Sequence, residues 1–331
     1  MVELIVDDQS PQVEYLCPVI KQQVSGTYFN NTWTTIADNR CGGGWFQHTF
    51  YGTGVQVIGS SSRVNQNHSV KIDEGPWVKQ SGLGSFKLPL LPDGRHTIVY
   101  AADEKDLFPT FDYLVVTAGP STPLRHNSII VDDTDSTLVY SGHWRTQPTR
   151  SFSHDSSTAT FKNTTHWSTA VGDTVKFQFN GDSINVFGAF TNLMPSSNFS
   201  ATYTLDSVPF TGYIPSGALD NLPMAKLFGA DIDPGDHILV VNVTHISPPL
   251  AVGIDFISYN ASFDSLASMP GYTSSSSLSS PPRLSAGAIA GSVIGGVALL
   301  VVALVTAMFF WRWRRGTRRR KEGKRWSELK F

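Results

Sequence analysis

The sequence predicts a mainly β protein, with two tandem antiparallel β-sandwiches followed by one transmembrane α-helix. Three observations predict this fold. Short segments rich in β-branched and aromatic residues alternate with Gly, Asn, Asp and Pro turn signals. Several of these segments recur in the same order further along the chain. A long uncharged run then follows, close to the C-terminus.

An internal repeat relates residues 1–118 to residues 126–262. IVDD occurs at 5–8 and again at 130–133, and FYGTGVQVIG corresponds to FNGDSINVFG. VKIDEGPW, PDGRHTIVY and FDYLVV then correspond to YTLDSVPF, PGDHILVV and IDFISY. Matches in one order indicate a duplication, and each unit is long enough to enclose one core between two sheets. The Pro-containing segment 119–125 between the units predicts a hinge.

The remaining chain predicts a membrane anchor. Residues 263–283 are rich in Ser and Pro and predict an extended stalk. Residues 284–310 carry no charge and are long enough to span a bilayer. The tail at 311–331 holds ten Lys and Arg against two Glu, whereas the rest of the chain holds 15 against 25 Asp and Glu.

Basic residues beside a span stay on the cytosolic side. We therefore expect a single-pass protein with a cytosolic tail and an extracellular or luminal N-terminal region, most simply in the plasma membrane. The basic cluster beside the span predicts contact with anionic membrane lipid and argues against nucleic-acid binding.

Asn-x-Ser/Thr sequons support this topology, because six precede the span and none follows it. They predict a glycoprotein modified at Asn30, Asn67, Asn163, Asn198, Asn242 and Asn260. The segment after Met1 is too short for a signal peptide. We expect either an unusual signal-anchor or a natural leader that this sequence lacks.

Two smaller patterns predict covalent and helix–helix contacts. In an oxidising compartment, Cys17 and Cys41 would form a disulfide worth roughly 3 kcal/mol, the alternative being two buried free thiols. Gly287, Gly291 and Gly295 form a ridge along the predicted span that would allow a homodimer. The alternative is general glycine richness of the span.

The repeated motifs resemble a known group of proteins. Paired units with IVDD, a central FxGxxxxVxG, VKID or YTLD, and a closing FDY or IDF resemble the galactose-binding-like β-sandwiches of fungal single-pass membrane proteins. The resemblance covers nearly the whole chain. It implies two jelly-roll domains but no settled activity, because a fold does not determine a ligand.

The paired aspartates of the IVDD motifs do not predict catalysis. Asp7 and Asp8 are adjacent, as are Asp132 and Asp133, so the two side chains of each pair point to opposite faces of a strand. A glycosidase needs two carboxylates that flank one bond. A structural role in turns is expected, with a structural Ca²⁺ on Asp132, Asp133 and Asp135 as the weaker alternative.

No other motif predicts an enzyme or a cofactor. His96 and His237 occupy matched positions before strands, and we expect them to stabilise turns. There is no Gly-x-Ser-x-Gly motif, and CGGGW at 41–45 lacks the lysine of a phosphate-binding loop.

Tryptophans are the better lead to a ligand, since sugar rings stack on aromatic side chains. Trp45 and Trp144 have no counterpart in the other unit and are the candidate ligand-binding residues. Two others keep an aromatic counterpart and are expected in the core: Trp33, matched by Trp167, and Trp77, matched by Phe210.

These features predict a single-pass surface glycoprotein whose outer region binds a glycan, a cell-wall polysaccharide or another surface ligand. Two alternatives stay open. One is an extracellular carbohydrate-active enzyme, and the other is a structural surface protein without a specific ligand.

Overall fold

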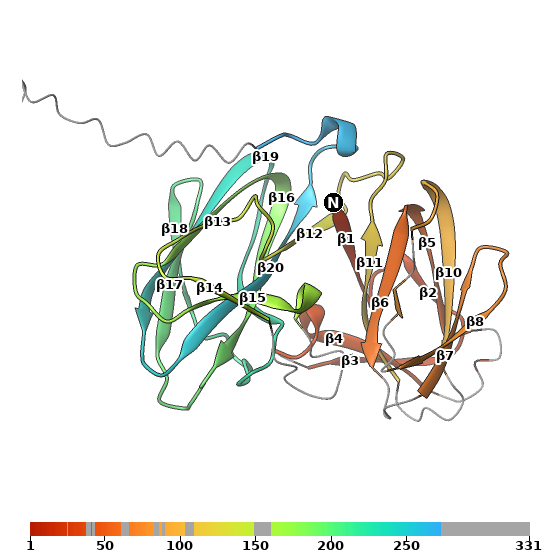
Figure 1. The fold of residues 1–331 in the computed structure, drawn as a ribbon, viewed down its shortest axis with the longest axis horizontal. Helices are drawn as coiled ribbons and strands as arrows, with labels where there is room; N and C mark the ends of the chain where they lie inside the picture. The colour runs from red at the N-terminus through yellow and green to blue at the C-terminus, as the bar shows by residue number, and fades with distance from the viewer. Residues whose placement is uncertain are drawn as a thin grey trace, which may run out of the picture. The chain divides into compact units, whose positions relative to one another are not determined.

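The computed structural model describes residues 1–24, 26–37, 41, 44–60, 66–82, 86–87, 90–102, 109–148 and 160–272. Met1–Ser274 form one compact unit. The fold is mainly β (Figure 1), as the sequence predicts, and the helical segments within the described ranges are three-residue 3-10 turns. None of these described segments is long and apolar enough to cross a membrane. The predicted span, the tail and the glycine ridge lie outside the described residues.

The first half of the compact unit, residues 1–118, is called the N-terminal half. Its elements are β1 (Glu3–Asp7), β2 (Val13–Tyr15), β3 (Val19–Gln23), η1 (Phe29–Asn31), β4 (Thr32–Ile36), β5 (Phe46–Gly52), β6 (Gly54–Ser60), β7 (Gln66–Ile72), β8 (Val78–Gly82), β9 (Phe86–Lys87), β10 (Gly94–Ala102) and β11 (Thr110–Thr117).

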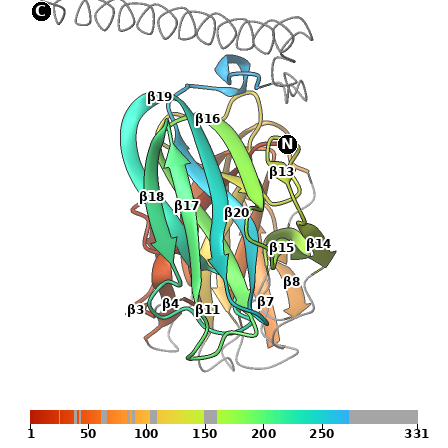
Figure 2. The ribbon, with the colours of Figure 1, turned by 90° about the vertical axis from the view of Figure 1, so that its left-hand side faces the viewer.

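Residues 126–262 form the C-terminal half. Its elements are β12 (Ser128–Asp132), β13 (Val139–Ser141), β14 (Arg145–Pro148), η3 (Phe161–Asn163), β15 (Thr164–Ser168), β16 (Thr174–Thr191), β17 (Phe199–Leu205), β18 (Val208–Tyr213), β19 (Ala225–Ile246) and β20 (Ala251–Ala261). A third turn, η4 (Leu266–Ser268), follows. Figure 2 shows the long strands of this half lying along one another.

The internal repeat is also visible in the backbone conformation. In both halves an IVDD strand is followed by a 3-10 turn whose middle residue has a positive φ, 50° at Asn30 and 51° at Lys162. Such values are uncommon for residues other than glycine. The same unusual turn at matched positions shows that the two halves share a local structure that the five sequence matches do not include.

Two sheets contain most strands. β2, β5, β10, β7 and β8 form a five-stranded sheet within the N-terminal half. The other sheet has 15 strands and runs through both halves, because β1 pairs with β11 on one side and with β12 on the other. The register places Leu4 opposite Ile129.

Apolar side chains from both halves meet beside this pairing. Phe29 of η1 lies 5.2 Å from Phe187 and 6.3 Å from Phe256, measured between ring centroids. Tyr113 and Ile130 belong to the same buried cluster. Full burial of one such side chain contributes about 1.5 to 3 kcal/mol, so the contact between the halves is a hydrophobic core of its own.

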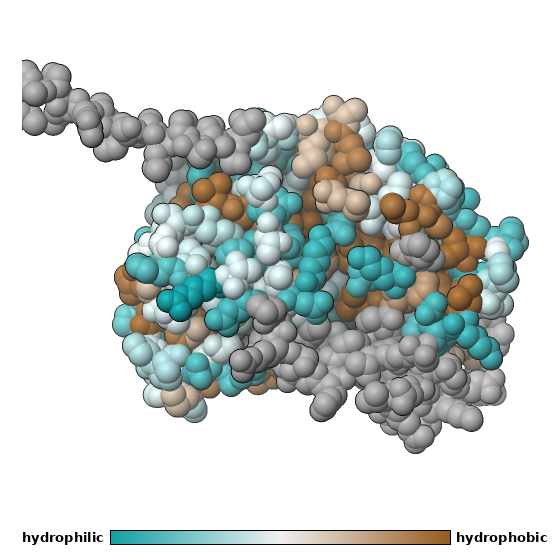
Figure 3. Space-filling view, in the orientation of Figure 1, coloured by the Kyte–Doolittle hydropathy of each residue, from teal (hydrophilic) through white to brown (hydrophobic). Residues whose placement is uncertain are grey.

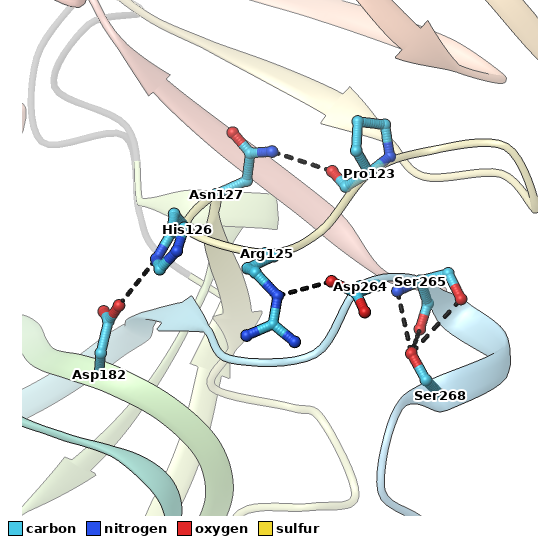
Figure 4. Close-up of polar contacts among 8 residues, drawn as sticks. All are labelled: Pro123, Arg125, His126, Asn127, Asp182, Asp264, Ser265 and Ser268. Atoms are coloured by element: carbon cyan, nitrogen blue, oxygen red, sulfur yellow. Dashed lines mark hydrogen bonds and ion pairs between the residues drawn. The ribbon is translucent and has the colours of Figure 1, made fainter.

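The segment between the halves is packed, which differs from the expected free hinge. Leu124 is fully buried, and the hydroxyl of Thr122 donates to the carbonyl of Tyr51 at 2.9 Å. Figure 4 shows Arg125 and His126 reaching in different directions, to Asp264 and Asp182.

The first residues of the predicted stalk also pack against the fold. Phe263 is buried, Asp264 accepts a 2.6 Å hydrogen bond from Arg125, and the hydroxyl of Tyr272 donates to Asp236 at 2.5 Å. Residues 263–272 are therefore part of the compact unit. Any extended stalk begins after them.

Candidate functional site

The second aspartate of each IVDD motif is a buried structural anchor. Asp8 accepts a 2.7 Å hydrogen bond from the hydroxyl of Thr32 and another from Thr34. Asp133 accepts 2.6 Å bonds from Thr164 and from Nδ1 of His166. Burial raises the pKa of Asp8 to about 7. These contacts leave no open carboxylate pair at either position.

A further buried aspartate supports each anchor. Asp112 accepts a 2.9 Å hydrogen bond from the backbone N–H of Phe29, and Asp255 accepts the matching bond from Phe161. Oδ2 of both aspartates is buried without a partner among the described residues. Burial raises the pKa of both carboxyls well above the usual value, so the uncharged form is favoured. The paired aspartates therefore hold the 3-10 turns in place.

The three candidate calcium ligands have hydrogen-bond partners within the fold. Asp132 bonds to Thr134, Asp133 to Thr164 and His166, and Asp135 accepts a 2.9 Å bond from the backbone N–H of Thr137. Within the described ranges, no three His, Cys, Asp or Glu side chains are arranged to hold a metal ion. Asp132 and Asp135 therefore contact their own turn, whereas Asp133 contacts side chains of β15.

The matched histidines stabilise turns, as the sequence suggests. Nδ1 of His96 lies 2.8 Å from Asp73 Oδ2, and its Nε2 lies 2.8 Å from the carbonyl of Pro92. His237 makes the same contacts with Asp206 and with the carbonyl of Asp233. Both ring nitrogens of each histidine are engaged, so neither is free to act on a ligand.

The two candidate tryptophans do not form a binding site. Trp45 is 1% exposed and packs against Phe46, Tyr100 and Phe111. This corrects the sequence prediction, because Trp45 follows a loop but points into the core. Trp144 is half-buried, and its Nε1–H donates to the carbonyl of Thr174 at 3.0 Å.

The matched aromatic positions also differ from the expectation. Trp77 and its counterpart Phe210 are 45% and 43% exposed, so they are not core residues. Trp33 and Trp167 are half-buried, and the matched turns place Thr165 rather than Trp167 at the position of Trp33, so these two tryptophans are not counterparts. The face seen in Figure 3 mixes hydrophilic and hydrophobic residues, and an aromatic side chain at a duplicated position need not be buried.

Cys17 and Cys41 form a disulfide, with 5.3 Å between their Cα atoms. The bond ties the bend between β2 and β3 to the segment before Trp45. It lies in the N-terminal half only and has no counterpart in the repeat.

A polar cleft lies where the two halves meet. Its volume is about 370 Å³, within the range of small-ligand sites. β1 and the η1 turn contribute one wall, and β12, β16, β19 and β20 contribute the other. Most lining side chains carry hydrogen-bonding groups: Asp7, Ser10, Gln12, Asn30, His126, Asn127, Ser128, Ser183, Asn185, Lys226, Asp231, Ser258 and Asn260.

The strand register explains how the second wall becomes polar. Along β16, Ser183 and Asn185 alternate with buried Ile184 and Val186, so one face of the strand is apolar and the other polar. Asn185 pairs with Gly229 of β19. A Cβ at Gly229 would lie 2.4 Å from Lys226 Cε and 2.7 Å from Asn185 Oδ1, so glycine gives these two side chains room.

Two groups of the cleft are energetically unusual. The hydroxyl of Ser258 is buried and has no hydrogen-bond partner among the described residues. Lys226 is exposed, and partial loss of hydration lowers its pKa, with Asp231 acting in the opposite direction. The Lys226 ammonium would gain from a ligand with hydroxyl or carbonyl oxygens.

Sequence reasoning missed this cleft. The alternation of Ser183 and Asn185 was visible in the second copy of the FxGxxxxVxG motif. That pattern identifies a strand with a polar face but not the segment that covers it. The covering wall comes from η1, more than 150 residues earlier in the chain.

No known protein family matches the sequence, and no curated protein matches it. Solved structures with some similarity include a xanthan lyase from Paenibacillus, with a TM-score of 0.31 and 11% identity over 76% of this chain. The chain spans 26% of that lyase.

Carbohydrate-binding modules are also among the similar structures. The CBM36-1 domain of a multidomain xylanase from the hindgut metagenome of Trinervitermes trinervoides has a TM-score of 0.27 and 13% identity, over 44% of this chain and 99% of the domain. The CBM22-1–CBM22-2 tandem domain of Paenibacillus barcinonensis Xyn10C has a TM-score of 0.26 and 9% identity, over 79% of this chain and 98% of that one. TM-scores this low carry no functional argument, so function has to be argued from the cleft.

Proposed function

We propose that the compact unit binds an oligosaccharide in the cleft between its two halves. The observation that carries this proposal is the lining of the cleft by amide, hydroxyl, carboxylate and ammonium groups. A sugar presents hydroxyls that both donate and accept hydrogen bonds. Such a ligand matches a wall that offers Asn185, Lys226 and Asp231 side by side with serines.

The proposed cellular setting follows from the sequence. We propose a single-pass surface glycoprotein with two jelly-roll units of the galactose-binding-like type, related to those of fungal membrane proteins. The basic tail would contact anionic lipid at the cytosolic face of the membrane, and the glycine ridge would support a homodimer. Mapping glycosylation and protease protection in microsomes tests the topology, and protection of the tail but not of the N-terminal region would contradict it.

Binding without catalysis is the favoured form of this function. Asp7 and Asp231 both line the cleft, so the carbohydrate-active enzyme is the alternative to test. Asp7, however, already accepts hydrogen bonds of 2.9 Å from the backbone N–H of Gln9 and from Asn30. This places Asp7 in a structural role rather than in that of a free acid or base.

The test is a glycan array with the purified full chain, followed by a hydrolysis assay on each ligand found. Lys226→Ala should weaken binding roughly tenfold or more, because it removes a charged donor from the cleft. Lys176→Ala is the matched control, since Lys176 is exposed on the neighbouring strand β16 and does not line the cleft. Equal effects of both variants, or no binding to any glycan, would refute the proposal.

A further inference from the structure

Two of the six sequons place their asparagines at the cleft. Asn260 of β20 lines the second wall, next to Ser128 of β12 and Ser183 of β16 in the strand register. Asn30 lies opposite, on the exposed η1 turn. Asn163 and Asn198 are exposed and do not line the cleft. The sequons therefore fall into a group at the cleft and a group away from it.

We propose that an N-linked glycan on Asn260 lies in the cleft and occupies it as a ligand in cis. The proposal deepens the proposed function and rests on it and on the predicted extracellular or luminal location. A carbohydrate attached to Nδ2 of Asn260 starts within the cleft, so its first sugars meet the same polar groups that would bind a free oligosaccharide.

The attachment is an ordinary group transfer. Nδ2 of Asn260 forms a C–N bond to C1 of the reducing sugar of a lipid-pyrophosphate-linked oligosaccharide. The C1–O bond to the pyrophosphate breaks, and Nδ2 loses one proton. The host cell's transferase carries out this step on the unfolded chain during translocation, so later burial of the site does not prevent it.

The size of the cleft limits how much of the glycan it holds. A volume of about 370 Å³ suits a small ligand. The two N-acetylglucosamine units at the base of the glycan would remain inside, and the branched part would extend into solvent. Because the ligand is tethered, its effective concentration at the cleft is in the millimolar range. A free oligosaccharide must compete with it.

Asn30 plays a different part at the rim. Its Nδ2 donates to Asp7 Oδ2 at 2.9 Å. A glycosylated amide keeps one N–H, so this hydrogen bond can persist after modification. A glycan on Asn30 would then cover the opening of the cleft without filling it.

Site-resolved mass spectrometry of the full chain from eukaryotic cells tests the proposal directly. We expect Asn260 to be occupied, and we expect its glycan to resist peptide N-glycosidase until the protein is denatured. The glycans on Asn163 and Asn198 should be released from the native protein. An unoccupied Asn260, or release from Asn260 as fast as from Asn198, would overturn the proposal.

A variant pair tests the competition. Ser262→Ala removes the Asn260 sequon without changing Asn260, and it should fold because the Ser262 hydroxyl is buried with no partner among the described residues. Ser200→Ala removes the Asn198 sequon and is the matched control. Chitobiose, the disaccharide at the base of N-linked glycans, should bind the Ser262→Ala chain about tenfold more tightly than the wild type, and the Ser200→Ala chain as the wild type does.

The two proposals fail separately. If neither variant binds chitobiose or any arrayed glycan, but the Asn260 glycan resists native digestion, the cleft holds only the tethered glycan and the binding function is wrong. If the Asn260 site is open to native digestion and Ser262→Ala binds no more tightly than the wild type, the inference is wrong and oligosaccharide binding can still stand.

Discussion

The two halves of the compact unit keep one polar framework but fill it with different side chains. In the N-terminal half, Thr34 donates to the buried Asp8, whereas in the C-terminal half His166 donates to the buried Asp133. His166 also bonds through Nε2 to the hydroxyl of Thr146 at 2.8 Å. The comparison shows that, at the second aspartate of each IVDD motif, the repeat preserves a donor for both carboxylate oxygens and not a particular donor residue.

A second difference concerns how each half is held together. The N-terminal half has a disulfide. Its segment that corresponds to β16 forms two strands, β5 and β6, with Thr53 between them. The C-terminal half has no described disulfide and uses the continuous 18-residue strand β16. The halves therefore reach stability by different routes, and the following predictions separate those routes.

The largest effect is expected from Phe256→Ala, because Phe256 is fully buried in the cluster that both halves share. The cavity should lower the free energy of unfolding by about 3 to 5 kcal/mol. Urea unfolding followed by tryptophan fluorescence should still show one transition, since both halves contribute to that cluster. Two separate transitions, with only one displaced, would show that the halves unfold independently.

The disulfide should stabilise the N-terminal half more than the C-terminal half. The Cys17→Ser, Cys41→Ser double variant should lose roughly 3 kcal/mol, because a 24-residue separation leaves the unfolded chain much freer. Hydrogen exchange should accelerate first in β2, β5 and β10. Equal acceleration in β17 and β18 would contradict a local effect.

The buried Asp8 contributes to a pH dependence of stability, and Asp112 and Asp255 contribute with the same sign because burial raises their pKa values too. The pKa of Asp8 is raised to about 7, so the folded state holds a proton that the unfolded state releases near pH 4. This contribution to stability is complete below about pH 4 and is lost as the pH rises through 7, on the order of 4 kcal/mol for about three pKa units at about 1.4 kcal/mol each.

Asp8→Asn should reduce the decrease in the free energy of unfolding between pH 4 and pH 8. Urea midpoints measured from pH 4 to pH 8 provide the readout, with Asp233→Asn at an exposed position as the control. An unchanged slope in Asp8→Asn would show that Asp8 does not take up the proton.

The smallest effect is expected at the matched exposed aromatics. Trp77→Ser and Phe210→Ser should each change stability by less than about 0.5 kcal/mol, since surface substitutions rarely cost more. Of the two residues, Phe210 is the better candidate for a packing role, because its ring centroid lies 5.7 Å from that of Phe228. Thermal denaturation of both variants would reveal such a role as a larger loss for Phe210→Ser alone.

The sequence predicted the mainly β fold because alternation and turn residues act locally. It also predicted the turn role of His96 and His237, since the two histidines occupy matched positions before strands; their aspartate partners, Asp73 and Asp206, became visible only in the structure. The side on which Trp45 lies was not predictable. A tryptophan after a glycine loop can face either way, and β5, β10 and β11 decide it.

The cleft was beyond sequence reasoning for a different reason. Lys226 and Asp231 lie outside every repeated motif, and Ser258 lies inside the IDFISY motif among buried residues. The packing of one half on the other adds β1 and η1 to the cleft that these residues line. The FNNT and FKNT segments at 29–32 and 161–164 were a usable signal for the matched turns, and hence for one wall of the site.

The pairing of β1 between β11 and β12 has a consequence for synthesis. As the chain leaves the ribosome, β1 emerges early but finds both neighbours only after residues 110–132 have been made. Until then, its apolar Leu4, Ile5 and Val6 remain without the strands that will shield them. A chaperone that binds short apolar segments would find a target in β1, and truncation before β12 would leave that target without one of its two neighbouring strands.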